Sequence, residues 1–268
     1  MPELDVDGVK LAYEERGGGQ PVLLVHGTGG AVWDPLPELL DEAGFRAIWY
    51  HRRGFGASAH SPIKDPPRHM RDAAALLEAL DAAPAIVVGH SMGGVLSLDL
   101  AVRRPDVVRA LVLIEPPLHF KKNPSVKMVR SLVGAQITRR VRGDRQAAAS
   151  FMRWATSTTD GANGYDATPP ELQAELLGNS AAIMRELDSG TGEHVKPEEI
   201  GRIECPLVVL VGGITLPEYG KAAQRIAAAR PATEIVDVPG AGHVLPVTHP
   251  EAVVDAVRRV AGGPALAS

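Results

Sequence analysis

The chain has 268 residues, a net charge of -4 and one cysteine, with acidic and basic residues mixed along its length. This length can bury a large core, and the charge balance excludes a dedicated nucleic-acid binder while favouring an enzyme that acts on small molecules. Cys205 can form no internal disulfide, which fits a reducing compartment, so we expect a cytoplasmic protein in which this residue only packs.

The N-terminal stretch MPELDVDGVKLAYEE is acidic and alternates polar with apolar residues. It therefore predicts a β-hairpin around Asp7-Gly8 and no signal peptide. No apolar run approaches the roughly 18 residues of a membrane span. We expect a small-molecule partner and neither nucleic acid nor a membrane span, with a homodimer left open. No Cys and His cluster has metal-ligand spacing, so we expect no metal or organic cofactor.

Continuous apolar runs alternate with helical segments through most of the chain. Runs that are apolar at consecutive positions are typical of parallel strands covered on both faces. The pattern therefore predicts an α/β doubly wound domain. The predicted strands are 22–25, 45–50, 85–88, 108–114, 207–211 and 234–238, and the predicted helices are 72–81, 92–103, 219–229 and 250–261.

The alternation stops after Ile114 and resumes at Leu207. The intervening stretch has helical periodicity and no buried strand, which indicates a helical cap inserted into the sheet domain. The predicted organisation is a core domain of residues 1–116 and 205–263, a cap of residues 117–204 and a frayed tail of residues 264–268.

A basic segment lies within the predicted cap. Residues 121–145 contain eight Lys and Arg and one acid, Asp144. The first interpretation is a solvated helix face, and the alternative is a surface for an anionic membrane or an acidic partner. The sequence leaves both open.

The pentapeptide Gly89-His90-Ser91-Met92-Gly93 carries the clearest chemical signal. It lies between a predicted buried strand and a predicted helix, which is the context that gives the G-x-S-x-G nucleophile elbow its meaning. Small neighbours allow the sharp turn, and the following helix N-terminus favours negative charge nearby. We therefore predict that Ser91 is a nucleophile; the alternative is a polar turn residue.

A second glycine-rich loop follows the predicted strand near the N-terminus, in LLVHGTGG at residues 23–30. In an elbow enzyme, such a loop supplies a backbone N–H opposite the one that follows the nucleophile. We predict that the oxyanion donors are the N–H groups of Met92 and Thr28, or of Gly27 in place of Thr28. The alternative is that these glycines only form a tight turn.

His243 stands apart from the other eight histidines. It lies between the last predicted strand and the last predicted helix, in VPGAGHVLPVTHPE, where Gly240 and Gly242 allow the loop to fold back over Ser91. We predict that His243 is the general base. We expect His26 and His90 to pack and orient backbone, and His51, His60, His69, His119, His194 and His249 to lie at the surface or form local hydrogen bonds.

Together, the motifs HGTGG, RRGFGAS, GHSMGG and GAGH…HPE make the chain resemble the α/β-hydrolase fold superfamily from Leu4 to Ala261. The resemblance implies a mostly parallel, twisted sheet flanked by helices. It also implies a catalytic triad in the chain order serine, acid, histidine, which Ser91 and His243 fit.

The acid of this triad is missing from its usual position, which aligns with Thr215. Loss of the acid costs about four powers of ten in turnover, because the histidine loses its tautomer and orientation. Glu115 directly follows the predicted strand 108–114, which neighbours the strand that usually carries the acid. From there its longer side chain can reach His243, so we predict that Glu115 is the acid. Glu218 is the rival, and the alternative role for Glu115 is to cap the cap domain's first helix.

With an acid in this place, the chain is similar to the zearalenone lactonase group, small α/β-hydrolases that open a macrocyclic resorcylic lactone. The similarity rests on Glu115-Pro116-Pro117, on VGGITLPE at 211–218 and on PGAGHVLPVTHPEA around His243. It implies a Ser-His-Glu hydrolase of ester or lactone bonds that forms an acyl-enzyme. The alternatives are a general carboxylesterase, a C–C bond hydrolase or, less favoured, a non-catalytic ligand receptor.

The cap of that group carries a substrate-contacting tryptophan, whose position falls near residues 182–184, where this chain has no aromatic residue. Trp154 is the candidate replacement, and the alternative is that it packs in the core. We expect the cap to close an apolar pocket above Ser91. The predicted substrate-binding residues are Leu118, Trp154, Ile183, Met184, Leu216 and Tyr219, with Phe120, Leu132, Phe151 and Met152 as further candidates for the wall.

Overall fold

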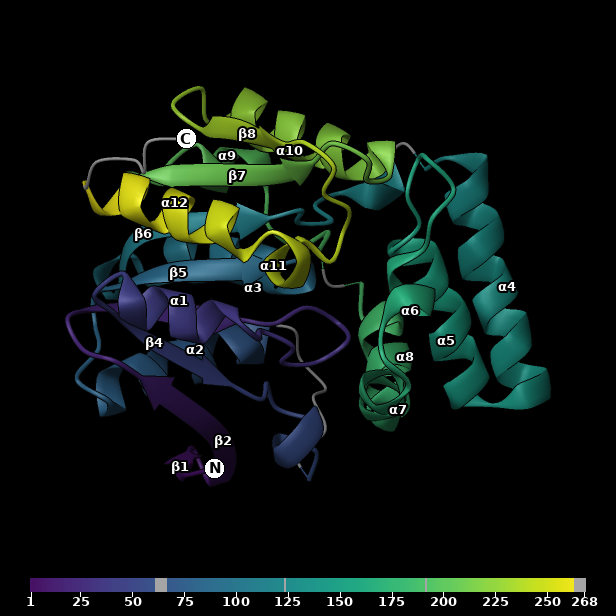
Figure 1. The fold of residues 1–268 in the computed structure, drawn as a ribbon, viewed down its shortest axis with the longest axis horizontal. Helices are drawn as coiled ribbons and strands as arrows, with labels where there is room; N and C mark the ends of the chain where they lie inside the picture. Colours follow the sequence, from purple (N-terminus) through teal and green to yellow (C-terminus); the bar gives the residue numbers. More distant parts are fainter. Residues whose placement is uncertain (61–66, 123, 191, 263–268) are drawn as a thin grey trace.

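The computed structural model describes residues 1–60, 67–122, 124–190 and 192–262. Within these residues, eight strands form one sheet in the order β1-β2-β4-β3-β5-β6-β7-β8 (Figure 1). The predicted hairpin is confirmed: β1 pairs antiparallel with β2, β2 pairs antiparallel with β4, and all later neighbours are parallel. The strands are β1 (Glu3–Val6), β2 (Val9–Arg16), β3 (Gln20–Val25), β4 (Phe45–Tyr50), β5 (Ala85–His90), β6 (Val108–Ile114), β7 (Leu207–Gly212) and β8 (Glu234–Val238).

Helices cover both faces of this sheet. Apolar side chains of α2, α3 and α10 form a core with one face, and those of α1 and α12 form a second core with the other. The four predicted helices are present, whereas α1 was not anticipated. These helices are α1 (Leu36–Glu42), α2 (Pro67–Ala79), α3 (Met92–Arg103), α10 (Pro217–Ala229), α11 (Leu245–Thr248) and α12 (Pro250–Ala261).

The central strands are apolar at consecutive positions because both of their faces are covered. In β3, Leu23 and Val25 belong to the core beneath α2 and α3, whereas Val22 and Leu24 belong to the core beneath α1 and α12. Successive strand residues point to opposite faces, so an uninterrupted apolar run fills both cores. The predicted α/β-hydrolase fold is confirmed.

Between β6 and β7 the chain forms a group of helices beside the sheet, with α4 farthest from it (Figure 1). We call residues 117–204 the helical insertion. Within it, α4 packs on α5 and α5 packs on α8, whereas α9 packs on α10 and α3 of the sheet domain. The tail 264–268, predicted to fray, lies outside the described residues. The insertion contains α4 (Val126–Arg142), α5 (Asp144–Ala155), α6 (Gly164–Ala167), α7 (Pro170–Gly178), α8 (Ser180–Asp188) and α9 (Pro197–Ile200).

The parallel arrangement brings the loops that follow β3, β5, β6, β7 and β8 to the carboxyl edge of the sheet, which is where open α/β sheets bind ligands. Thr28, Glu115, Thr215 and His243 lie on these loops, and Ser91 lies in the turn between β5 and α3. None of the helices in the described parts of the chain has the length and apolar character needed to cross a membrane.

Candidate active site

Ser91 occupies a strained turn between β5 and α3. Its backbone has φ 52° and ψ -124°, a region that non-glycine residues rarely adopt, and its N–H donates to the Ile114 carbonyl at 2.8 Å. Close packing maintains the turn, because a Cβ on Gly93 would lie 2.0 Å from the Val25 carbonyl oxygen. The geometry is that of a nucleophile elbow, with the hydroxyl displayed beyond the strand end.

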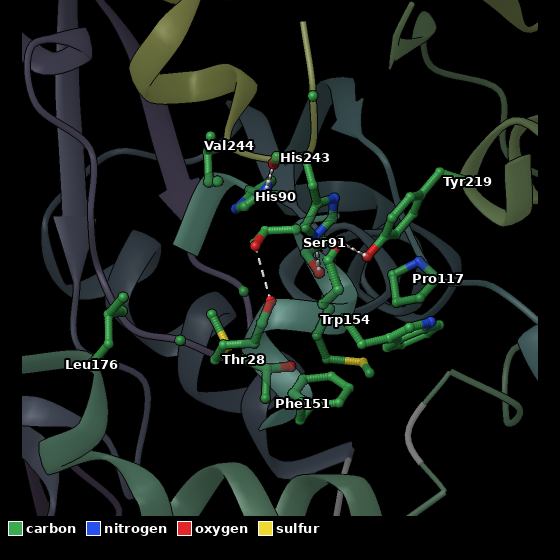
Figure 2. Close-up of a pocket in the computed structure, with 18 of the residues that line it drawn as sticks. Thr28, His90, Ser91, Pro117, Phe151, Trp154, Leu176, Tyr219, His243 and Val244 are labelled. Atoms are coloured by element: carbon green, nitrogen blue, oxygen red, sulfur yellow. Dashed lines mark hydrogen bonds between the residues drawn. The ribbon is translucent and has the colours of Figure 1, made fainter. Parts of the chain in front are cut away.

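Ser91, His243 and Glu115 form a continuous hydrogen-bonded chain. Figure 2 shows its Ser91 and His243 members. The Nε2 atom of His243 lies 3.0 Å from Ser91 Oγ, and its Nδ1 atom lies 2.6 Å from Glu115 Oε2. A carboxylate only accepts hydrogen bonds, so Nδ1 carries the ring proton and Nε2 is the atom that can accept the serine proton. This is the arrangement that a base-activated serine requires.

Three donors hold the Glu115 carboxylate, whose side chain is fully buried. In addition to His243, the Gly212 N–H donates to Oε1 at 2.8 Å and the Thr215 hydroxyl donates to Oε2 at 3.0 Å. A buried carboxylate is costly unless hydrogen-bonded, and here each oxygen has at least one donor. Thr215, at the usual acid position, therefore supports the carboxylate of the neighbouring loop.

Glu218 is turned away from this chain. It lies in the first turn of α10 and accepts a hydrogen bond from the hydroxyl of Ser125, the residue that caps α4. Within the described residues its carboxylate makes no hydrogen bond to His243. The structure thus brings Glu115, and not its rival Glu218, to the imidazole.

Two side chains support the His243 loop. Tyr219 stacks on the imidazole with ring centroids 4.1 Å apart and an interplanar angle of 14°, and its hydroxyl donates to the Ala155 carbonyl (Figure 2). Burial raises the pKa of Tyr219, so it remains neutral. His90 Nε2 lies 2.8 Å from the His243 carbonyl oxygen. Burial and the nearby His243 lower the pKa of His90 to about 3, so its neutral ring donates to that carbonyl.

The loop after β3 lies against the elbow, since a Cβ on Gly27 would be 2.9 Å from Ser91 Cβ. No hydrogen-bond acceptor is found for the Thr28 or Met92 N–H within the described ranges. Both donors belong to residues that border the same cavity as Ser91. They are therefore available to a bound oxyanion, as the sequence predicts.

The orientation of the Thr28 N–H follows from its peptide unit. The Gly27 carbonyl accepts from Arg52 Nη2 at 3.0 Å and from His26 Nδ1 at 2.6 Å. A trans peptide is planar, so fixing the Gly27 oxygen on one side points the Thr28 N–H to the other. The Nε2 atom of His26 accepts a hydrogen bond from the backbone N–H of Arg52, so the ring proton is on Nδ1. Burial lowers the pKa of His26 well below the usual value, so the ring remains neutral.

Arg52 and Glu186 form a buried ion pair that sequence reasoning missed. Arg52 donates from Nη1 at 2.6 Å and from Nη2 at 3.2 Å to the two oxygens of Glu186, on α8 of the helical insertion. The partners are 134 residues apart, so no local motif could pair them.

Two histidines lie deeper than expected. His69 is buried, with Nε2 3.2 Å from Arg52 Nη1, and burial together with that cation lowers its pKa well below the usual value. His119 is also buried, and its Nε2 lies 2.8 Å from the Val195 carbonyl oxygen. Surface positions were therefore the wrong expectation for both, because each ring packs against a distant segment, His69 against Arg52 and His119 against Val195.

A cavity of about 520 Å³ lies between the loops and the helical insertion, with Ser91 and His243 in its wall (Figure 2). Of the predicted contacts, Trp154 and Tyr219 line it, as do the four further wall candidates. The cavity falls within the usual size range of small-molecule sites, about 300–1,000 Å³. Its apolar lining includes Phe120, Met128, Leu132, Phe151, Met152, Trp154, Leu172, Leu176, Ile214 and Val244.

Four predicted contacts do not line this cavity. Leu118 and Leu216 pack into the core on the α3 side of the sheet, and Ile183 packs against Phe55 and Ala148. Met184 is fully buried outside the cavity wall. For the two residues on α8, the physical reason is that the helix packs this face on α5, so its cavity residues are Glu186 and Leu187. Leu118 and Leu216 flank strand ends and pack into the core beneath them. Helical periodicity in a sequence indicates which face of a helix is buried. It does not indicate whether that face packs in the core or lines a cavity.

No group of three or more His, Cys, Asp or Glu side chains in the part of the chain that the structure describes is arranged to hold a metal ion.

A sequence model of the alpha/beta hydrolase family matches residues 22–256. The chain belongs to the alpha/beta hydrolase family. It is 41% identical over 110 residues to "Putative non-heme bromoperoxidase BpoC" of Mycobacterium tuberculosis, a match that spans 40% of this chain and only 42% of that relative.

Two solved structures illustrate the similarity over nearly the whole chain. A thermophilic esterase from Thermogutta terrifontis superposes with a TM-score of 0.75 and 26% identity, covering 97% of both chains. The enol-lactonase from Burkholderia xenovorans LB400 superposes with a TM-score of 0.76 and 22% identity, covering 97% of this chain and all of that one. The second likeness speaks for the fold alone, because one fold hosts many activities.

Proposed function

We propose that this alpha/beta hydrolase is a serine hydrolase that cleaves an ester or lactone bond through an acyl-enzyme. One observation carries the proposal. The Ser91 hydroxyl, the His243 imidazole and the Glu115 carboxylate are joined in the order of proton transfer, and the serine opens into an apolar cavity. The similarity to the T. terrifontis esterase supports this choice of bond.

In the proposed mechanism, Ser91 Oγ attacks the carbonyl carbon while His243 Nε2 takes its proton. The tetrahedral oxyanion accepts hydrogen bonds from the Thr28 and Met92 N–H groups. Glu115 stabilises the imidazolium, which then protonates the leaving alkoxide. Water activated by His243 releases the acid, and a lactone yields a hydroxy acid because its alcohol stays tethered to the acyl group.

Arg52 has a positioning role in this scheme. Through the Gly27 carbonyl it fixes the peptide whose N–H receives the oxyanion, and through Glu186 it ties that peptide to the helical insertion. A preorganised donor costs no reorganisation during the reaction, which is the main source of oxyanion stabilisation. The helical insertion thus acts as a cap that both closes the cavity and steadies the oxyanion loop.

The cavity wall favours a large apolar substrate with an aromatic ring. Phe120, Phe151, Trp154 and Tyr219 border it, with Phe151 and Trp154 rings 5.8 Å apart and Phe120 and Tyr219 rings 5.2 Å apart. Trp154 supplies the aromatic wall that the resemblance to zearalenone lactonases calls for, from a different helix. A macrocyclic resorcylic lactone such as zearalenone is therefore the substrate class that we propose.

The test is to incubate the purified protein and its Ser91→Ala variant with zearalenone and with p-nitrophenyl esters of increasing chain length. A serine-dependent product heavier by one water, identified by mass, is the expected result for the lactone. Ester cleavage without lactone cleavage would keep the serine hydrolase and reject the lactone.

Labelling with a fluorophosphonate separates the remaining alternatives. The wild-type protein should be labelled at Ser91, and the Ser91→Ala variant should not. Failure to label the folded wild-type protein, together with no ester cleavage, would favour a ligand receptor. Cleavage of a vinylogous diketone in place of any ester would favour a C–C bond hydrolase.

A further inference from the structure

Helix α4 carries an apolar stripe on its solvent side. The stripe residues follow one another at intervals of three or four positions, which places them on one helical face. In the described ranges, the only other exposed large apolar side chains are Met1 and Val247. So dense a clustering on one helix is not the usual scatter of surface residues. The stripe consists of Val126, Val129, Val133, Ile137 and Val141, which are 76%, 44%, 53%, 58% and 75% exposed.

Cations accompany this stripe, and helix α4 contains no acidic residue. Arg139 is bonded to Asp144 and Asp188, whereas the other four cations of the helix make no ion pair among the described side chains. At about 3.6 residues per turn, Arg130 and Arg140 fall on the same side as the stripe. The other two are Lys127 and Arg142, and all four are exposed.

We propose that helix α4 docks the protein on an anionic lipid surface. Apolar side chains interleaved with Lys and Arg suit a helix that lies in the plane of a membrane interface. Each of its cations near anionic headgroups should raise partitioning to the membrane roughly fivefold. The whole chain has a net charge of -4, so attraction to an anionic surface must be local to this region. Helix α4 is also the outermost element of the insertion (Figure 1).

The charge pattern disfavours a second copy of this chain as the occupant. In a two-fold interface the same surface patch meets itself. Two α4 helices would then bring cations against cations, with no carboxylate on either helix to neutralise them. The stripe alone would suit a dimer, but the stripe and its charges together suit an anionic membrane.

The other face of α4 links this surface to the cavity. Met128 and Leu132, which point away from the stripe, line the cavity that holds Ser91. Docking would therefore bring the cavity close to the lipid in which an apolar ester accumulates. This delivery of substrate rests on the proposed function, whereas docking itself is independent of it.

Vesicle co-sedimentation tests the docking without any measurement of activity. The full chain is mixed with vesicles of phosphatidylcholine alone or of equal parts phosphatidylcholine and phosphatidylglycerol. We expect binding to the anionic vesicles only, weakening as salt is raised. Arg130→Glu removes one positive charge and adds one negative, so partitioning should fall roughly thirtyfold. Val133→Ser with Ile137→Ser should also weaken binding.

The matched control is Lys221→Glu, the same change of charge at an exposed position on α10 of the sheet domain. It should leave vesicle binding unchanged, and circular dichroism should show that every variant is folded. No binding of the wild-type protein to anionic vesicles would overturn the proposal, as would equal loss in the Lys221→Glu control. A dimer in light scattering that Val133→Ser with Ile137→Ser dissociates would assign the stripe to a second copy. Capture of an acidic protein in place of vesicles would assign it to a protein partner.

Discussion

Strands β6 and β7 are adjacent in the sheet, and the segments at their carboxyl ends together place a carboxylate beside His243. The loop after β6 supplies the carboxylate of Glu115. The last residue of β7 donates to it through the Gly212 N–H, and the loop that follows donates through the Thr215 hydroxyl. In the fold superfamily that the chain resembles, the second loop usually carries the acid itself. The site thus fixes a carboxylate beside His243 Nδ1, and we expect that the loop after either strand could provide it.

The two loops differ in how they reach this point. Glu115 approaches from one strand farther away, and its extra methylene together with a left-handed backbone (φ 48°) brings the carboxylate to the imidazole. Thr215, on the neighbouring loop, reaches the same carboxylate with its short side chain. The comparison shows that a catalytic triad is recognised by the geometry of its three side chains and not by the sequence positions that carry them.

The largest expected effect tests which loop holds the acid. Glu115→Gln should lower kcat for ester cleavage about ten-thousandfold, because the amide disturbs the tautomer of His243. The matched control is Glu218→Gln, which removes the other carboxylate and should leave kcat near that of the wild type. Steady-state kinetics on a p-nitrophenyl ester measures both. The reverse ranking of the two variants would return the acid to the loop after β7.

A second experiment moves the carboxylate between the loops. Adding Thr215→Asp to Glu115→Gln should recover roughly a hundredfold of the lost kcat, at the low end of what a positioned acid–base group contributes. Thr215→Asp alone should lower kcat, because two adjacent carboxylates disfavour each other's charged form. If the double variant recovers nothing, the two loops are not interchangeable and the comparison fails.

The smallest effect concerns the supporting hydroxyl. Thr215→Val keeps the shape but removes the donor to Glu115, and a hydrogen bond to a charged group contributes about 1.5–3 kcal/mol. We expect kcat to fall about tenfold. We expect the free energy of unfolding to drop by about 1.5–3 kcal/mol. Parallel kinetics and urea denaturation measure these changes. An unchanged kcat would mean that Gly212 and His243 suffice to hold the carboxylate.

Residue patterns predicted the sheet and the elbow, and the resemblance to the α/β-hydrolase superfamily implied the order of the triad. Consecutive apolar residues require cover on both faces of a strand, and the glycines around Ser91 are required by contacts as close as 2.0 Å. The choice of Glu115 also followed from the sequence, since a buried carboxylate at a strand end needs a partner. The sheet is confirmed because it depends on local periodicity, whereas the catalytic roles of Ser91, Glu115 and His243 stay predictions.

The substrate-contact predictions succeeded only in part. Trp154 and Tyr219 line the cavity, whereas Ile183 and Leu216 are buried elsewhere, although all four lie in apolar segments. An apolar residue is buried equally well against the core or beside an empty space. For Ile183, the packing of α8 on α5 decides between the two, and for Leu216 the packing of the segment before α10 on the sheet decides.

The sequence by itself determined the parallel sheet, the serine at its elbow and the set of groups that can act on it, because these follow from periodicity, glycine sterics and chain order. Only the tertiary structure decided that Arg52 meets Glu186, that Thr215 supports Glu115, and that five apolar residues of α4 face solvent. Each of these depends on which surfaces meet when distant segments pack, and local patterns carry no record of that choice.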